Sequence, residues 1–183
     1  MKTTTLIDEI IRCGVTDNSS VIHFGSGYKN GQFLSDLSQK NVIEKYVGIE
    51  AESERINTTV DSLIKIGSPE KFKNILNMTM QDYVVDNNET YDFALITGIF
   101  DKQLYGDEQF QFIHSVINEM FNFVEDSVIF TYNALENQEE TYNIHYINGY
   151  IQNNYNRFSI LRINENEYLY CINKYYLSYT NTI

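Results

Sequence analysis

Basic residues are scarce in this sequence, which has 13 Lys and Arg against 25 Asp and Glu and a formal net charge of -12. A negative charge of this size repels phosphate backbones and anionic membrane surfaces. It therefore disfavours nucleic acid as a partner, although a local basic patch is still compatible with it.

Cysteine and long apolar runs are scarce as well. Cys13 and Cys171 lie far apart and do not have the spacing of metal ligands. This favours two free thiols in a reducing compartment over a disulfide, and it predicts no metal site. No run reaches the roughly 20 apolar residues that span a bilayer, and acidic residues interrupt the N-terminal apolar stretch, unlike in a signal peptide. We expect a cytoplasmic protein without a membrane partner.

What is present fits one compact globular domain, because the 183 residues are 43% hydrophobic and 21% charged. Strand-like apolar runs alternate with apolar residues at helical spacing. The pattern predicts helices over 4–13, 33–37, 56–64, 113–124 and 138–153, and strands over 21–24, 45–50, 75–78, 93–97 and 128–132.

The end of the chain has a different pattern. Two strand-like runs, 158–163 and 168–176, are separated only by Asn164-Glu165-Asn166-Glu167, which is too short for a helical crossover. They must therefore form an antiparallel hairpin. The predicted fold class is α/β, with a Rossmann-like, doubly wound, mostly parallel sheet that is closed by an antiparallel C-terminal hairpin strand.

Residues suited to ligand binding follow four consecutive strands. The first strand ends in Gly25-Ser26-Gly27, where glycines allow a ligand to approach the backbone closely. Glu50 ends the second strand, near the spacing at which an acidic side chain accepts hydrogen bonds from ribose hydroxyls. Gln81-Asp82 follows the third strand, and Thr97 ends the fourth. Since ligands bind at the carboxyl ends of parallel strands, these residues predict one shared site.

With these motifs the chain resembles the class I S-adenosylmethionine-dependent methyltransferases, over roughly residues 20–176. Residues 21–27 resemble the first motif of that family, a hydrophobic strand followed by acidic-x-Gly-x-Gly, and 46–50 resemble its second strand with a terminal acid. Gln81-Asp82 resembles the adenine-contacting acid, and the closing hairpin resembles the antiparallel seventh strand. Within the family the chain looks most like small single-domain members encoded by bacteriophages and other viruses.

The resemblance implies a single methyltransferase-like domain over 1–183, with an N-terminal helix (1–18), a cofactor-binding core (19–136) and a helix plus closing hairpin (137–183). It implies S-adenosyl-L-methionine as the cofactor. The expected cofactor-binding residues are His23, Gly25, Ser26, Gly27, Tyr28, Glu50, Ala51, Gln81, Asp82 and Thr97.

Two features depart from the family pattern. His23 stands where the family usually has Asp or Glu, so the customary carboxylate is absent. The segment Tyr28-Lys29-Asn30 lengthens the loop before Gly31. Tyr28 or Lys29 then either reaches the cofactor's carboxylate or points to solvent, and the sequence does not choose between the two.

Catalytic residues are hard to name, because aligned methyl transfer does not require a strong base. Asp101, Tyr132 and Asn133 follow strands four and five and are the weak candidates, with loop residues in local hydrogen bonds as the alternative reading. The Asn/Asp-Pro-Pro-Tyr/Phe motif of amino-methylating DNA enzymes is absent, and residues 97–100 occupy its place. A small-molecule or protein acceptor is expected. The alternatives are a methyltransferase fold kept for binding or assembly, and a nicotinamide-dependent oxidoreductase.

Overall fold

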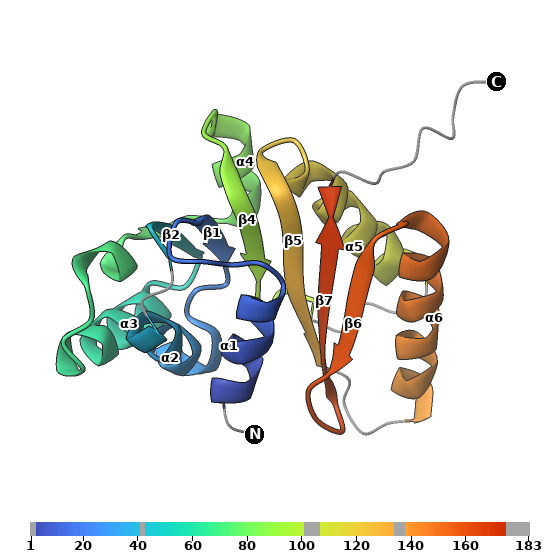
Figure 1. Ribbon diagram of the computed structural model, residues 1–183, viewed down its shortest axis with the longest axis horizontal. Coiled ribbons are helices and arrows are strands. Elements are labelled where there is room, and N and C mark those ends of the chain that lie inside the picture. The colour runs from blue at the N-terminus through green and yellow to red at the C-terminus, as the bar shows by residue number, and fades with distance from the viewer. Residues whose placement is uncertain (1–2, 41–42, 101–106, 134–137, 175–183) are drawn as a thin grey trace.

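The computed structural model describes residues 3–40, 43–100, 107–133 and 138–174, and it forms a seven-stranded sheet flanked by helices (Figure 1). The strand order is β3-β2-β1-β4-β5-β7-β6. The strands are β1 (Ser20–Phe24), β2 (Lys45–Glu50), β3 (Ile75–Asn77), β4 (Tyr91–Ile96), β5 (Val124–Asn133), β6 (Phe158–Arg162) and β7 (Glu167–Asn173).

The direction of the strands confirms the predicted fold class. The strands from β3 to β5 pair in parallel, whereas β7 is antiparallel to both β5 and β6. The order reverses at β1 and β4, and in an open parallel sheet this is where the crevice for a ligand forms.

Helices cover both faces of the sheet (Figure 1). One face carries α1 (Thr3–Arg12), α2 (Gln32–Lys40) and α3 (Ser53–Lys65), and the other carries α4 (Met80–Asp86), α5 (Asp107–Met120) and α6 (Gln138–Asn154). Because side chains alternate along a strand, β1 serves both layers: Val21 packs with α1 and α2, whereas Ile22 and Phe24 pack on the side of α5.

The carboxyl edge of the parallel strands is the lower edge in Figure 1, where the β6–β7 turn also lies. Because β7 runs in the opposite direction, it begins at this edge. Its first residue, Glu167, therefore pairs with Asn133, the last residue of β5. The hairpin thus brings its turn to the same edge as the glycine turn after β1.

Some boundaries differ from those expected. Strand β5 begins at Val124, four residues earlier than the apolar run, because exposed Glu125 and Asp126 interrupt the pattern although the backbone is already extended. Helix α4 was not expected, since it has only seven residues. Its N-terminus is capped by Thr79, whose Oγ1 accepts from the Asp82 amide at 3.1 Å and donates to the Asp82 carboxylate at 2.7 Å.

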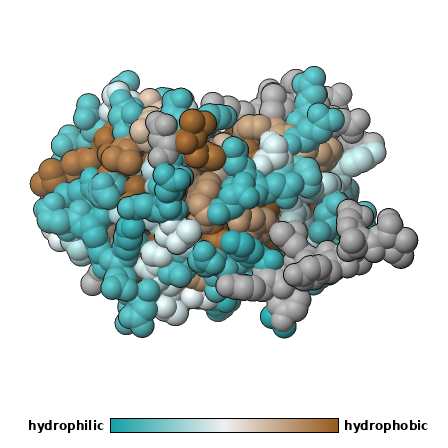
Figure 2. Space-filling model, turned by 90° about the horizontal axis from the view of Figure 1, so that it is seen from above, coloured by the Kyte–Doolittle hydropathy of each residue, from teal (hydrophilic) through white to brown (hydrophobic). Residues whose placement is uncertain are grey.

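The surface is largely hydrophilic, with separate hydrophobic patches, in the view of Figure 2. Among the described residues, the large apolar side chains that are exposed include Ile64, Ile66, Leu76, Val85 and Tyr146. No helix within the described ranges is both long and apolar enough to cross a membrane.

Candidate functional site at the carboxyl edge of the sheet

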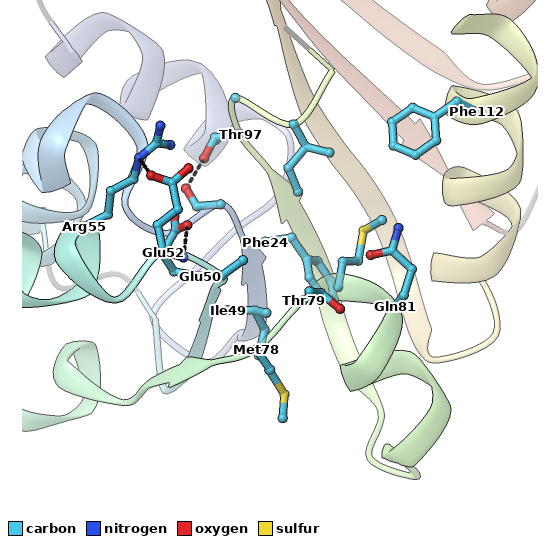
Figure 3. A pocket seen from close by; sticks show the side chains of 15 residues that line it. Phe24, Ile49, Glu50, Glu52, Arg55, Met78, Thr79, Gln81, Thr97 and Phe112 are labelled. Carbon is cyan, nitrogen blue, oxygen red and sulfur yellow. Dashed lines mark hydrogen bonds and ion pairs between the residues drawn. The ribbon is translucent and has the colours of Figure 1, made fainter. Parts of the chain in front are cut away.

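A cavity of about 210 Å³ lies where β1, β2, β3 and β4 end. In the close view of Figure 3, the charged side chains of Glu50, Glu52 and Arg55 lie together on one side of it, with Gln81 and Phe112 on the other. The cavity walls therefore include residues from the strand ends together with residues from α3, α4 and α5. Of the sequence-predicted cofactor residues, those that line it are Gly25, Glu50, Ala51, Gln81 and Thr97.

The glycine turn is held against two neighbouring strands. Gly25 has φ +77°, and a Cβ placed there would lie 2.1 Å from the carbonyl oxygen of Thr97. The amides of Gly25 and Ser26 both donate to the carbonyl of Ile49, at 2.9 and 3.2 Å. At Gly27 a Cβ would lie 2.8 Å from Glu50 Oε2. No other residue fits these two glycine positions without displacing Thr97 or Glu50.

Glu50 is the central polar group of the cavity. It is 6% exposed, and its carboxylate accepts from the Gly27 amide at 3.0 Å and from the Glu52 amide at 3.1 Å, one on each oxygen. Each oxygen retains a further lone pair. The carboxylate is therefore fixed in place and still able to accept hydrogen bonds from hydroxyl groups of a ligand.

His23 lies beneath the glycine turn rather than in the cavity wall, and it is fully buried. Its Nδ1 is 2.8 Å from the Tyr46 hydroxyl and its Nε2 is 2.7 Å from Thr97 Oγ1. Since Thr97 Oγ1 donates its proton to the carbonyl of Gly25 at 3.0 Å, Nε2 must donate to Thr97 and Nδ1 must accept from Tyr46. Burial lowers the pKa of His23 to about 3. The neutral ring therefore holds Thr97 and the turn through hydrogen bonds, without supplying the charge of the usual acid.

Two other predicted cofactor residues also face away from the cavity. Ser26 is fully buried against β2, where a Cβ at Gly48 would lie 3.0 Å from its Oγ. The Asp82 carboxylate accepts a hydrogen bond from Thr79 Oγ1 at the start of α4, while its neighbour Gln81 lines the cavity. Because the Asp82 carboxylate lies against the Thr79 hydroxyl, Gln81 rather than Asp82 is the residue of this pair that faces the cavity.

Tyr28 and Lys29 do not line the cavity of Figure 3, and their polar groups contact the protein rather than pointing only to solvent. They belong to a short turn segment, η1 (Tyr28–Gly31), and the side chains of both donate to Glu167 at the start of β7. With Gly27, Asn30, Arg55 and Gly98 they line a second hollow of about 280 Å³ beside the main cavity. The longer loop thus bridges the glycine turn to the closing hairpin.

The catalytic candidates lie further along the same edge. Tyr132 is 4% exposed near the end of β5, and Asn133 is half-buried as its last residue. Asp101 lies outside the described residues. The structure therefore places two of the three candidates at the carboxyl edge, on the side of the cavity that faces the hairpin.

Several residues of the site were not expected from the sequence. Arg55 and Phe112 line the cavity from helices, where they differ little from any other exposed or apolar helical residue. Met78 and Met80 flank the end of β3 and gave only a weak apolar signal. Glu167 was assigned to a turn, and no local pattern indicates a partner 138 residues away.

Comparison with known proteins identifies the fold through solved structures, whereas the two sequence comparisons find no match. No protein-family model matches the chain, and no curated protein matches it. Among solved structures, it is similar to magnesium protoporphyrin IX methyltransferase from Synechocystis PCC 6803 with bound SAM, at 13% identity and a TM-score of 0.63, over 94% of this chain and 77% of that one.

Two further structures agree. The methyltransferase domain of bacterial CtHen1 has 15% identity and a TM-score of 0.63, over 94% of this chain and 96% of that one. A SAM-dependent methyltransferase from Aquifex aeolicus has 16% identity and a TM-score of 0.61, over 91% and 88% of the two chains. The protein therefore has the class I methyltransferase fold. These likenesses give no support to the narrower resemblance to phage and viral members.

Proposed function

We propose that this protein is an S-adenosylmethionine-dependent methyltransferase. The observation that carries the proposal is the fixed carboxylate of Glu50 in a cavity at the carboxyl edge of a methyltransferase fold. It stands where an acid is needed to accept hydrogen bonds from ribose hydroxyls. The neighbour from Synechocystis was crystallised with SAM, which supports the same cofactor here. Residues 19–136 would form the cofactor-binding core of a single domain.

The residues present fit this cofactor chemically. Glu50 would hold the ribose, and Gln81 and Ala51 would lie beside the adenine, against the apolar side chains of Met78 and Phe112. Gly25 and Gly27 let the turn lie directly against Thr97 and Glu50, because a Cβ at either position would collide with one of these residues. When bound, S-adenosylmethionine supplies an electrophilic methyl group on a positively charged sulfur.

The contribution of the protein to transfer would be alignment rather than strong base catalysis. Holding two reactants in line is worth roughly 7 to 11 kcal/mol. Tyr132 and Asn133 lie at the edge where an acceptor would dock and are the proposed substrate-side residues. The net charge of -12 disfavours nucleic acid as acceptor, so a small molecule or a protein is proposed.

Incubation with methyl-labelled S-adenosylmethionine tests this function. The protein is mixed with fractionated metabolites and proteins, and label is measured in each fraction. We expect label in one acceptor class with the wild type and little with Glu50→Ala. Equal labelling by both proteins in every fraction would count against the proposal.

A second candidate is a methyltransferase fold retained for binding or assembly. It is favoured by His23, which is neutral and buried where the family usually has an acid. This candidate predicts that S-adenosylmethionine binds but that no fraction becomes labelled. A nicotinamide-dependent oxidoreductase is disfavoured by the antiparallel β7, and titration with dinucleotide distinguishes it.

A further inference from the structure

The longer loop after the glycine turn is tied to the far end of the sheet by one buried carboxylate. Glu167 is 2% exposed. Lys29 Nζ lies 3.0 and 3.2 Å from its two oxygens, the Tyr28 hydroxyl donates to Oε1 at 3.2 Å, and Asn164 Nδ2 donates to Oε2 at 3.1 Å. Three side chains from two distant segments therefore satisfy one carboxylate, which is the condition under which a buried charge is tolerated.

The backbone of the loop needs such an anchor. Lys29 and Asn30 have φ of +53° and +54°, in the left-handed region that residues other than glycine avoid. Asparagine tolerates this region because its short side chain bonds locally, but the long lysine side chain does not make such a bond. The Lys29 side chain instead reaches Glu167, so the ion pair holds the residue whose backbone is least favourable.

The position of the loop links it to the cofactor cavity. Tyr28 lies against Gly98, where a Cβ would come within 2.6 Å of its Cδ2, and Gly98 lines the main cavity. The other end of the contact, Glu167, pairs with the substrate-side candidate Asn133. The Lys29–Glu167 contact therefore connects the glycine turn to the acceptor side of the edge.

We propose that Glu167 is a positioning residue for cofactor binding, which holds the 28–31 loop in its binding conformation through Lys29. The inference rests on the proposed function for the identity of the cofactor. The Lys29–Glu167 contact itself is independent of that function. A loop that is ordered before binding loses less conformational entropy on binding, so the contact raises cofactor affinity without touching the cofactor.

Calorimetry with S-adenosylhomocysteine measures the effect in Glu167→Gln, Lys29→Met and the double variant. We expect each single variant to bind about tenfold more weakly, and the double variant to bind no more weakly than either, since both remove one shared interaction. Lys29→Arg restores affinity to within about twofold of the wild type, because a guanidinium also pairs with a carboxylate. Lys45→Met is the matched control, because it breaks the exposed Lys45–Glu89 pair at the opposite edge and leaves affinity unchanged.

Hydrogen exchange without any ligand provides the independent readout. Amides of 25–31 exchange faster in Glu167→Gln than in the wild type, while those of β4 are unchanged. The proposal is overturned if these amides exchange equally in both proteins, or if the wild type binds S-adenosylhomocysteine and the single variants match it within about twofold. If the wild type does not bind the probe, the proposed function fails, and hydrogen exchange still decides whether Glu167 orders the loop.

Discussion

The buried, neutral His23 makes the stability of this protein depend on pH in a defined window. Burial lowers the pKa of its ring from the ordinary 6.5 to about 3. A group whose pKa is lower in the folded state contributes stability that is fully present above pH 6.5 and is lost as pH falls toward 3. In this window the unfolded chain binds a proton that the folded protein does not.

The magnitude follows from the two pKa values. At pH 5 the protonated form of the histidine outnumbers the neutral form roughly thirtyfold in the unfolded chain, whereas the folded protein holds the ring almost entirely neutral. The free energy of unfolding is therefore about 2 kcal/mol lower at pH 5 than at pH 7.5. Further acidification to pH 3 raises the loss to about 4 to 5 kcal/mol from His23 alone. Losses of this size are a large part of the stability of an ordinary domain.

Urea unfolding of the wild type and of His23→Gln at pH 7.5 and pH 5 measures the effect. Glutamine keeps polar atoms near Tyr46 and Thr97 but does not titrate in this range. We expect the wild type to lose about 2 kcal/mol more than the variant between the two pH values. The reasoning would be refuted by equal losses in the two proteins, or by an NMR titration in which the His23 ring is protonated near its ordinary pKa.

Two further outcomes test the turn and the thiols. Gly25→Ala lowers the free energy of unfolding by well over the roughly 1 to 2 kcal/mol that the left-handed conformation alone costs, because its Cβ meets Thr97. Gly67 has φ +64° and open space around it, so Gly67→Ala costs only the conformational amount. Thermal unfolding of the two variants measures the difference. A hydrogen bond from Cys171 lowers the pKa of the Cys13 thiol, while the contact with Cys13 and burial raise that of Cys171. Iodoacetamide with peptide mass mapping therefore finds Cys13 alkylated first, and equal rates would contradict this order.

The fold was predictable because its signals are local. Apolar runs that alternate with helical spacing, and a four-residue gap too short for a crossover, were enough for a parallel sheet closed by a hairpin. The places of Gly25 and Glu50 in the cavity wall could be predicted for the same reason, since Gly25 directly follows β1 and Glu50 ends β2, and both strand ends must lie at the carboxyl edge.

The remainder of the site depends on contacts that no short segment encodes. Asp82 resembles a family motif, yet its carboxylate lies against the hydroxyl of the N-cap Thr79, and Gln81 faces the cavity instead. His23 sits in a motif position, but its hydrogen bonds to Tyr46 and Thr97 form only when β1, β2 and β4 are paired. Glu167 contacts Lys29 only because the antiparallel direction of β7 brings it to the edge where the glycine loop lies.

The central claim is that S-adenosylmethionine binds at the carboxyl edge with its ribose on Glu50. Calorimetric titration of the wild type, Glu50→Ala, Glu50→Gln and the exposed-acid control Glu89→Gln tests it most directly. We predict saturable binding by the wild type and by Glu89→Gln. Binding by the two Glu50 variants should be weaker by about tenfold or more, since hydrogen bonds to a charged acceptor are worth about 1.5 to 3 kcal/mol. Absence of binding by the wild type at millimolar cofactor, or equal affinity in all four proteins, would contradict the account.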